Sequence, residues 1–391
     1  MLHHPKIGVR MLFKALLELV LSLRDTSIEV HEWNQSDVRS PRLANGSTLD
    51  MVSTKHRDLS FSGCQLAHAV VKADYLDTRN LTMPGIGFLF QASGIIDFGS
   101  CPLALKLGAG RALNDFSLTG ITGRVGQGLA MLYAHRMGLK FAAHLKSYVS
   151  SLPSGSVGAA HQNERMADFL FSNDHETVLI EAKGSFTLLE NNPSDIKKVL
   201  KKALEKQVDP WMRYLQPAPS NGYVIYSCLR DNASEPSAMF IVDPEGDDTE
   251  PSELPMTVEQ VIRENYAAWL RAMGLSDSAG RLLRRTSDVS PPVEYSFLVV
   301  EIGGRKFAFV DHYLRIGNSL VWCFEPCLGL DFQVLRAISS VIQSSQESLQ
   351  DLLGNFPDPS EASRTYVSVF PDGSIFSLID WDRYYVERIV L

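Results

Sequence analysis

The chain has 391 residues, of which 45% are hydrophobic and 21% are charged, a composition typical of a globular protein. Its net charge of −8 excludes a protein coated in positive charge, so any nucleic-acid site must be a local basic patch on an acidic body. A chain of this length can form two or three domains, each with its own hydrophobic core.

The five cysteines are scattered and odd in number, which favours a reducing compartment over a disulfide framework. Cys323 and Cys327 form the one close pair, and ordinary buried thiols fit it better than a zinc site. Residues 11–23 are apolar, but Lys14 and Glu18 interrupt them and the stretch is too short to span a bilayer. We interpret it as a buried helix and expect a cytoplasmic protein without a membrane partner.

The first half of the chain has few clear signals. Residues 33–60 are polar without a clear period, which predicts a loop. A helix is expected over residues 122–137, with Thr122 as its N-cap and Gly138 as its stop. Residues 140–152 fit a helix and a strand equally well.

Three glycines lie inside this expected helix, at Gly123, Gly126 and Gly128. Each weakens a helix by about 1 kcal/mol relative to alanine. Such a cost indicates that another backbone or a ligand approaches the helix closely, and Gln127 lies among these glycines.

Two apolar runs of strand length flank a polar turn at residues 172–176, which predicts a β-hairpin. Asp168 opens the first run, and Glu181 and Lys183 close the second. Side chains alternate between faces along a strand, so Glu181 and Lys183 point the same way. Charges are rarely placed at the ends of apolar strands without a metal, a partner or a catalytic task.

A lysine-rich helix is expected over residues 193–208, with Ser194 as its cap. Its lysines are more typical of a solvated helix face than of a DNA-binding patch. Later elements have clearer signals: buried strands at 221–229 and 238–242, a helix at 257–273 capped by Thr257 and stopped by Gly274, a hairpin at 295–312 turning at Gly303 and Gly304, a helix at 333–353 and a hairpin at 366–379.

The acidic, proline-rich residues 243–256 are the preferred domain boundary. We therefore divide the chain into an N-terminal α+β region (1–110), a central domain (111–245) and a C-terminal α+β module (257–391). The predicted fold class is a multidomain α/β (α+β) protein whose central mixed β-sheet is flanked by helices.

The charged residues of the hairpin suit a divalent cation. Mg²⁺ prefers oxygen ligands and is usually bound by one or two carboxylates, its own waters and substrate phosphate. Asp168 and Glu181 supply the carboxylates, and the backbone carbonyl of Ala182 is a natural third ligand for Mg²⁺ or Mn²⁺. Lys183 would then orient the attacking water or neutralise charge that develops on a phosphate.

Asp168 followed by Glu181-Ala182-Lys183 resembles the motif of the PD-(D/E)XK nuclease superfamily, which has the restriction-endonuclease-like fold. The resemblance covers roughly residues 115–235 and implies an αβββαβ core. Many members carry an acidic residue on the helix before the core strands, where this chain has Gln127. Gln207 resembles a glutamine that some members have after the motif, and Trp211 stands near the position of their tyrosine.

The resemblance implies a metal-dependent nuclease with DNA as its partner, an endonuclease effector of a bacterial restriction or anti-phage defence system. A partner subunit or self-assembly would help an acidic protein to hold DNA. Two other functions stay open: a nuclease-like module that binds nucleic acid or assembles without cleavage, and an RNA-processing nuclease. The structural alternative is a surface ion pair between Lys183 and either acid.

Overall fold

The computed structural model describes residues 24–77, 92, 94–109, 115–152, 165–173, 176–186, 192–231, 236–243, 254–283, 291–310, 313–316, 319–322, 327–344, 347–353, 366–377 and 384–391. The predicted helix at 11–23 and the side chains of Cys323 and Cys327 lie outside these residues. Among the other cysteines, Cys64, Cys101 and Cys228 are free thiols.

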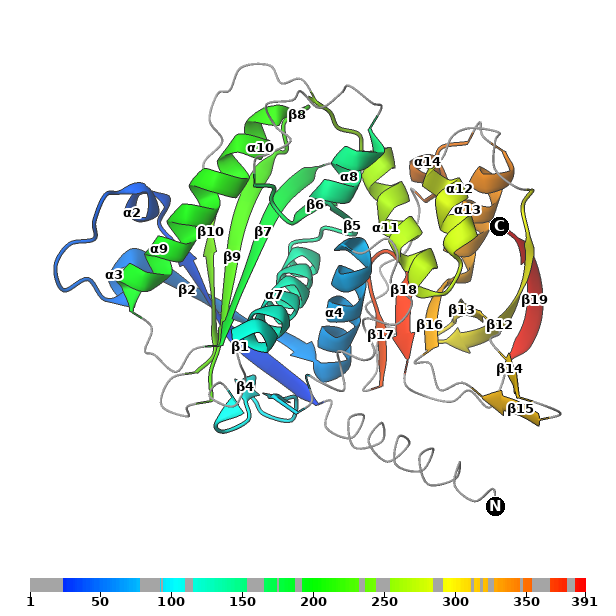
Figure 1. Ribbon diagram of the computed structural model, residues 1–391, viewed down its shortest axis with the longest axis horizontal. Coiled ribbons are helices and arrows are strands. Elements are labelled where there is room, and N and C mark those ends of the chain that lie inside the picture. Colours follow the sequence, from blue (N-terminus) through cyan, green and yellow to red (C-terminus); the bar gives the residue numbers. More distant parts are fainter. Residues whose placement is uncertain are drawn as a thin grey trace.

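The central element is a seven-stranded sheet in the order β2-β1-β10-β9-β7-β6-β5 (Figure 1). Its strands are β1 (Asp25–Trp33), β2 (Ser53–Ser62), β5 (Phe141–His144), β6 (Phe169–Ser172), β7 (Thr177–Phe186), β9 (Asn221–Leu229) and β10 (Ala238–Val242). Pairing is parallel between β7 and β9 and between β10 and β1, and antiparallel between the other neighbours. The expected mixed central sheet is therefore present.

Helices cover both faces of this sheet (Figure 1). On one face α4 (Gly63–Asp77) packs against α7 (Asp115–Arg136); on the other lie α9 (Pro193–Ala203), the π-helical turn η1 (Leu204–Val208) and α10 (Asp209–Tyr214). Two glycines show the arrangement: a Cβ on Gly184 of β7 would meet α7, whereas a Cβ on Gly222 of β9 would meet Val208 and Met212. The sheet register puts these two glycines on opposite faces.

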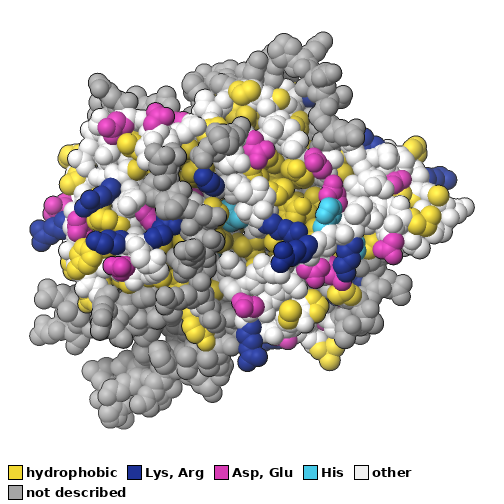
Figure 2. Space-filling model, turned by 180° about the vertical axis from the view of Figure 1, so that it is seen from behind, with side chains coloured by type: hydrophobic (Ala, Val, Ile, Leu, Met, Phe, Trp, Pro, Cys, Tyr) yellow, Lys and Arg dark blue, Asp and Glu magenta, His cyan; other side chains and the backbone are white. Residues whose placement is uncertain are grey.

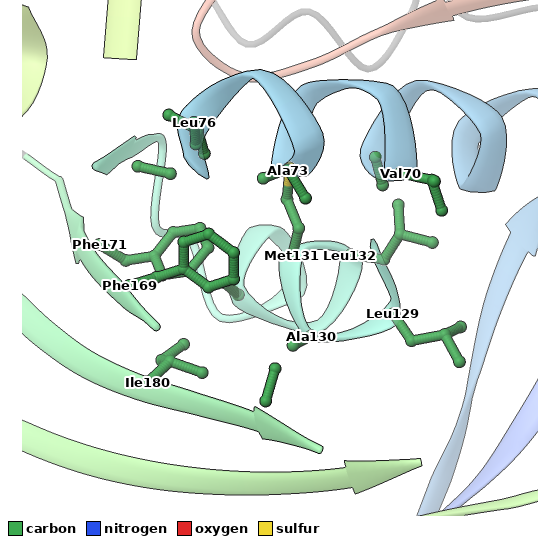
Figure 3. Close-up of a cluster of buried hydrophobic side chains, with 14 of the residues drawn as sticks. Val70, Ala73, Leu76, Leu129, Ala130, Met131, Leu132, Phe169, Phe171 and Ile180 are labelled. Atoms are coloured by element: carbon green, nitrogen blue, oxygen red, sulfur yellow. The ribbon is translucent and has the colours of Figure 1, made fainter. Parts of the chain in front are cut away.

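Apolar side chains between the sheet and its helices form the core on the α7 face (Figure 3). Strands β6 and β7 are buried on both faces, which explains why their sequences are continuous apolar runs rather than alternating ones. The side chains in contact come from four elements: Val70, Ala73 and Leu76 of α4, Leu129, Ala130, Met131 and Leu132 of α7, Phe169 and Phe171 of β6, and Ile180 of β7.

Of the three glycines noted in the sequence, at positions 123, 126 and 128 of α7, two allow close approach. A Cβ on Gly126 would lie 2.9 Å from the backbone of Gly184, and a Cβ on Gly128 would overlap Val70. Gly123 has open space around it. The expected backbone approach is thus confirmed, and it fixes α7 directly against β7.

A second sheet, in the order β17-β18-β16-β13-β12-β19, is built from the C-terminal part of the chain. Its strands are β12 (Glu294–Ile302), β13 (Arg305–Val310), β16 (Cys327–Asp331), β17 (Val367–Val369), β18 (Ser374–Ser377) and β19 (Tyr385–Val390). The accompanying helices are α11 (Val258–Ala272), α12 (Ser276–Leu283), α13 (Phe332–Gln343) and α14 (Leu349–Leu353).

Short elements complete the fold: α2 (Gln35–Arg39), α3 (Leu49–Val52), α8 (Leu145–Ser151) and three two-stranded sheets, β3 (Ile96–Asp97) with β4 (Ala104–Leu105), β8 (Leu215–Gln216) with β11 (Leu254–Pro255), and β14 (Tyr313–Ile316) with β15 (Ser319–Trp322). One buried apolar cluster includes side chains from residues 28–391. The predicted domain boundaries stay a prediction, and β1 and β2 share the central sheet with strands from residues 111–245.

The loop predicted for residues 33–60 is wrong. This stretch contains α2, α3 and most of β2. Residues 54–57 of β2, the edge strand of the sheet, are exposed on both faces, so this part of its sequence lacks the alternation that identifies a half-buried strand.

Helix ends were the other source of error. Helix α7 begins at Asp115, so Thr122 is an interior residue and not the N-cap, although Gly138 ends the helix with φ of +87°. Asn192, not Ser194, caps α9 by accepting a hydrogen bond from the Ser194 backbone. Residues 140–152 contain both candidates, strand β5 followed by helix α8. The helix predicted at 333–353 is two helices, α13 and α14.

Several predictions are confirmed. The hairpin of β6 and β7 is present, and strands β9 and β10 have the predicted bounds. Thr257 caps α11, and Gly274 follows its end with φ of +81°. Gly303 and Gly304 both have positive φ in the β12–β13 turn, as a type I′ turn requires. Strands β17 and β18 form the last predicted hairpin.

Candidate active site

The charged residues of the predicted motif converge where β6 begins and β7 continues past its partner. Strand β6 pairs with β7 as far as Phe169 and Ile180, so Asp168 and Glu181 are the next residues along the two strands. Lys183 lies two residues further along β7, on the same face as Glu181, and the two form an ion pair. The sequence prediction that these three residues come together is therefore met by the geometry.

Two contacts position the Asp168 carboxylate. Its Oδ2 accepts a hydrogen bond from the backbone N–H of Ala182 at 2.9 Å, and its Oδ1 accepts one from Nε2 of Gln127 at 3.4 Å. Gln127 projects from α7, whose close packing on Gly184 brings that helix to the site. The predicted helix residue thus reaches the site, as a donor to a carboxylate.

The backbone of Ala182 faces the same place. In a strand, the N–H and C=O of one residue point to the same edge. Since the N–H of Ala182 donates to Asp168, its carbonyl is directed to the Asp168 side of β7 as well. This is the orientation that a backbone ligand between Asp168 and Glu181 requires.

Glu181 is the most enclosed member of the site, with a fully buried side chain. Its Oε1 accepts a hydrogen bond from Nε2 of Gln207 at 2.6 Å and pairs with Lys183, which is partly exposed. Its Oε2 is buried without a hydrogen-bond partner in the part of the chain that the structure describes. A buried carboxylate oxygen without a partner is costly, which indicates that the site is completed by something else.

The electrostatics show the same imbalance. Burial and the nearby Asp168 carboxylate raise the pKa of Glu181 to about 8, against the opposing effects of Lys183 and Gln207. Burial also raises the pKa of Asp168, although the Ala182 N–H, Lys183 and His144 oppose it. Two acids face one ammonium, so the pair of carboxylates lacks positive charge.

The segment after the motif strand holds the chain that enters β6. Gln207 donates to the carbonyl of Met166 at 3.0 Å, and the indole N–H of Trp211 donates to the carbonyl of Arg165 at 3.0 Å. Gln207 lies in the π-helical turn η1, a distortion that is frequent at functional sites. Gln207 and Trp211 therefore position Asp168 by fixing the residues just before it.

These residues fit a divalent cation of the magnesium type. Asp168, Glu181 and the Ala182 carbonyl offer oxygen ligands, and the partnerless Oε2 of Glu181 is an available one. Among the described residues, no three His, Cys, Asp or Glu side chains form a metal-binding group. That excludes an all-side-chain cage there, whereas Mg²⁺ needs only one or two carboxylates and keeps several waters.

The lysines of α9 and η1 divide into two groups. Lys197 donates to the Ser40 hydroxyl at 2.6 Å, and Lys201 donates to the carbonyls of Arg39 and Ser40, so both hold α2 against α9. Lys198, Lys202 and Lys206 are exposed.

Sequence reasoning missed a second buried charge cluster, which joins α4 to the C-terminal sheet. Lys72 and Asp372 form an ion pair with side chains that are 1% and 0% exposed. Asp372 also accepts hydrogen bonds from Asn265 at 2.7 Å and from the Ser374 hydroxyl at 2.6 Å. The sequence showed Asp372 only as a turn residue, because Lys72 and Asn265, which join it to α4 and α11, lie more than 100 residues away.

His144, at the end of β5, was also missed; it pairs with Phe169, the residue after Asp168, and it acts to lower the pKa of Asp168 against the effect of burial. In the part of the chain that is described, no helical segment combines the length and hydrophobicity that a bilayer crossing requires. Comparison with known protein families, with curated proteins and with solved structures finds no match to this chain.

Proposed function

We propose that this chain is a metal-dependent nuclease, an endonuclease that hydrolyses phosphodiester bonds in DNA. The observation that carries the proposal is the partnerless, buried Oε2 of Glu181 beside a second carboxylate and a partly exposed ammonium. Two acids and one amine at the ends of neighbouring strands suit a cation that also binds a phosphate.

The order of elements around the site supports the proposal. Helix α7, strands β5, β6 and β7, the α9 segment and strand β9 follow one another along the chain, with α8 as a short insertion. Strands β5, β6 and β7 pair antiparallel, and β7 pairs parallel with β9. This is the αβββαβ order that the resemblance to the PD-(D/E)XK superfamily implies.

The roles of the residues follow from their positions. Asp168, Glu181 and the Ala182 carbonyl would hold Mg²⁺ or Mn²⁺, which lowers the pKa of bound water and offsets phosphate charge. Lys183 is the one cation of the three charged residues and its side chain is partly exposed, so it orients the attacking water or stabilises the charge on the phosphate oxygens. Gln127 keeps Asp168 in place through its amide.

The surface is consistent with a local site on an acidic protein. Figure 2 shows Lys and Arg side chains interspersed with Asp and Glu on one face, rather than a continuous basic area. By the same resemblance, we place the chain among effectors of bacterial restriction or anti-phage defence, where a partner subunit or a second copy of the chain helps to hold DNA.

Cleavage of plasmid DNA with Mg²⁺ or Mn²⁺ tests the proposal. Asp168→Ala and Lys183→Ala should each lower the rate by about 10²-fold or more, because each removes a group that stabilises the transition state. Asp195→Ala is a matched control: Asp195 and Lys197 form a second acidic-x-Lys triplet, but Asp195 is exposed at the start of α9, so this variant should cut normally. Equal rates for all variants would exclude the site.

Gln127 favours one alternative function, a nuclease-like module that binds or assembles without cleavage, because a neutral amide stands where many superfamily members have an acid. Calorimetric titration separates the two. Binding of Mn²⁺ that is lost in Glu181→Gln supports the nuclease, whereas no binding to the wild type favours the inactive module. Parallel assays on RNA and DNA separate an RNA-processing enzyme from a DNA endonuclease.

A further inference from the structure

The exposed lysines of α9 and η1 have no acidic partners among the described residues. Residues 193–214 contain six basic and three acidic residues, in a chain whose net charge is −8. Glu205 pairs with Lys201 at 3.6 Å, and both carboxylate oxygens of Asp209 accept hydrogen bonds from Arg39. The third acid, Asp195, lies in the first turn of α9. No described residue forms an ion pair with Lys198, Lys202 or Lys206, which we call the lysine stripe.

The stripe has a regular spacing. Lys198 and Lys202 are four residues apart on α9, which corresponds to a rise of about 6 Å between them. Positions i and i+4 lie on the same side of a helix, and Lys206 follows four residues later in the π-helical turn η1, so the three lysines continue as a row along one segment. The side of α9 that carries Lys197 and Lys201 is already covered by α2.

The stripe also ends at the candidate active site. Lys206 immediately precedes Gln207, whose amide donates to the buried Glu181 carboxylate at 2.6 Å. Since η1 contacts both β7 and β9, the row of lysines runs along α9 toward the strand that carries Glu181 and Lys183. A polyanion bound along the row would meet the site at its end.

We propose that the lysine stripe binds the phosphates of one DNA strand and leads that strand to the site at Glu181 and Lys183. Lysine contacts to phosphates position a nucleic acid without reading its sequence. The stripe thus supplies the local basic surface that an acidic nuclease needs. This inference rests on the proposed function and assigns the side from which the substrate enters.

Binding measured without catalysis tests the stripe independently of cleavage. Fluorescence anisotropy of a labelled DNA duplex, with the full chain in EDTA at several salt concentrations, gives the slope of log affinity against log salt. The triple variant Lys198→Gln, Lys202→Gln, Lys206→Gln should reduce this slope by about 2.7, since each phosphate contact contributes about 0.9. The affinity ratio of wild type to variant should then shrink roughly 40-fold between 50 and 200 mM salt.

A control variant removes the same charge elsewhere. Lys106, Lys306 and Arg388 are exposed in other parts of the chain, and changing all three to Gln should alter the slope by less than the contribution of about one phosphate contact. A stripe variant with the wild-type slope would overturn the inference even if the wild type cleaves DNA. A reduced slope without cleavage under any metal would support the stripe and overturn the nuclease proposal. A wild type that binds no DNA would overturn the stripe, and one that also cleaves none with Mg²⁺ or Mn²⁺ would overturn both.

Discussion

Two buried clusters in this molecule contain acids and a lysine, but only one of them satisfies the hydrogen bonds and charges of its carboxylates. We call it the complete cluster and the other the incomplete cluster. In the cluster of Lys72 and Asp372, one acid faces one amine, and both Asp372 oxygens accept hydrogen bonds from Lys72, Asn265 and Ser374. In the cluster of Glu181, two acids share one amine, and a carboxylate oxygen has no partner.

The pKa shifts express this difference. Burial would raise the pKa of Asp372, but Lys72, Asn265 and Ser374 outweigh burial and hold that pKa below its ordinary value. Burial and Asp168 raise the pKa of Glu181 to about 8. The pKa shifts of the Lys72 and Asp372 cluster are those of a structural ion pair, whereas the raised pKa of Glu181 beside a second carboxylate makes that cluster a functional-site candidate.

The largest expected loss of stability comes from a substitution that breaks the complete cluster. Asp372→Ala leaves Lys72 buried without its partner, so the free energy of unfolding should fall by about 3–5 kcal/mol. Urea denaturation of the full chain measures it, and Asp372→Asn serves if the alanine variant does not fold. Glu294→Gln, which breaks a pair with Arg388 on the exposed surface, is the control and should cost less than about 1 kcal/mol. Similar losses at both positions would show that burial does not distinguish the pairs.

The next prediction is a substitution in the incomplete cluster that should raise, rather than lower, the free energy of unfolding. Between pH 4.5 and about 8, folded Glu181 keeps a proton that the unfolded chain releases, so the unfolding free energy falls as pH rises, by about 1.4 kcal/mol per pH unit. Glu181→Gln should remove this fall and stabilise the metal-free protein by about 3 kcal/mol at pH 7, with little effect at pH 4.5. Urea titrations at both pH values in EDTA measure it. A destabilised variant at pH 7 would mean that Glu181 is already satisfied.

The complete cluster should respond to acid in the other direction. The pKa of Asp372 is lowered in the folded state, so its contribution to stability is present above its ordinary pKa of 3.8 and is lost as pH falls below that value. The same urea titrations, extended to pH 3, would show stability falling in the wild type and a smaller fall in Asp372→Asn.

The smallest effect concerns α7, which supports the incomplete cluster through Gln127. Gly126→Ala should lower the unfolding free energy by about 1–3 kcal/mol, because the new methyl group would press on the Gly184 backbone. Gly123→Ala meets open space and should raise it by up to about 1 kcal/mol through better helix propensity. Thermal unfolding of both variants measures the two changes in stability. Equal shifts of the melting temperature would contradict the packing of α7 on β7.

Sequence reasoning located the incomplete cluster because its signal is local. Asp168, Glu181 and Lys183 interrupt two apolar runs within sixteen residues, and strand alternation then fixes their faces. The complete cluster has no such signal. Lys72 lies on a helix and Asp372 in a turn, 300 residues apart, and neither position is unusual for its residue type.

Other details of the site could likewise be predicted only where their signal is local in the sequence. The role of Gln207 follows from the π-helical turn, whose extra residue per turn no propensity pattern reveals. The cap at Asn192 was missed because Ser194 is an equally good capping residue and the choice depends on backbone geometry. Gly126 and Gly128 of α7 were informative because the backbone of Gly184 and the side chain of Val70 leave no room for a Cβ there, whereas Gly123 meets open space and carried no such information.

The two edge strands of the central sheet are protected from pairing with other molecules in different ways. Strand β5 lies at one end and is covered by α11, where the side-chain oxygen of Asn265 accepts a hydrogen bond from the Ala142 backbone at 3.1 Å. Strand β2 lies at the other end and exposes Lys55, His56 and Arg57. Charged edge strands resist the addition of strands from other molecules. The polarity that made β2 resemble a loop therefore protects the sheet from growing into a polymer.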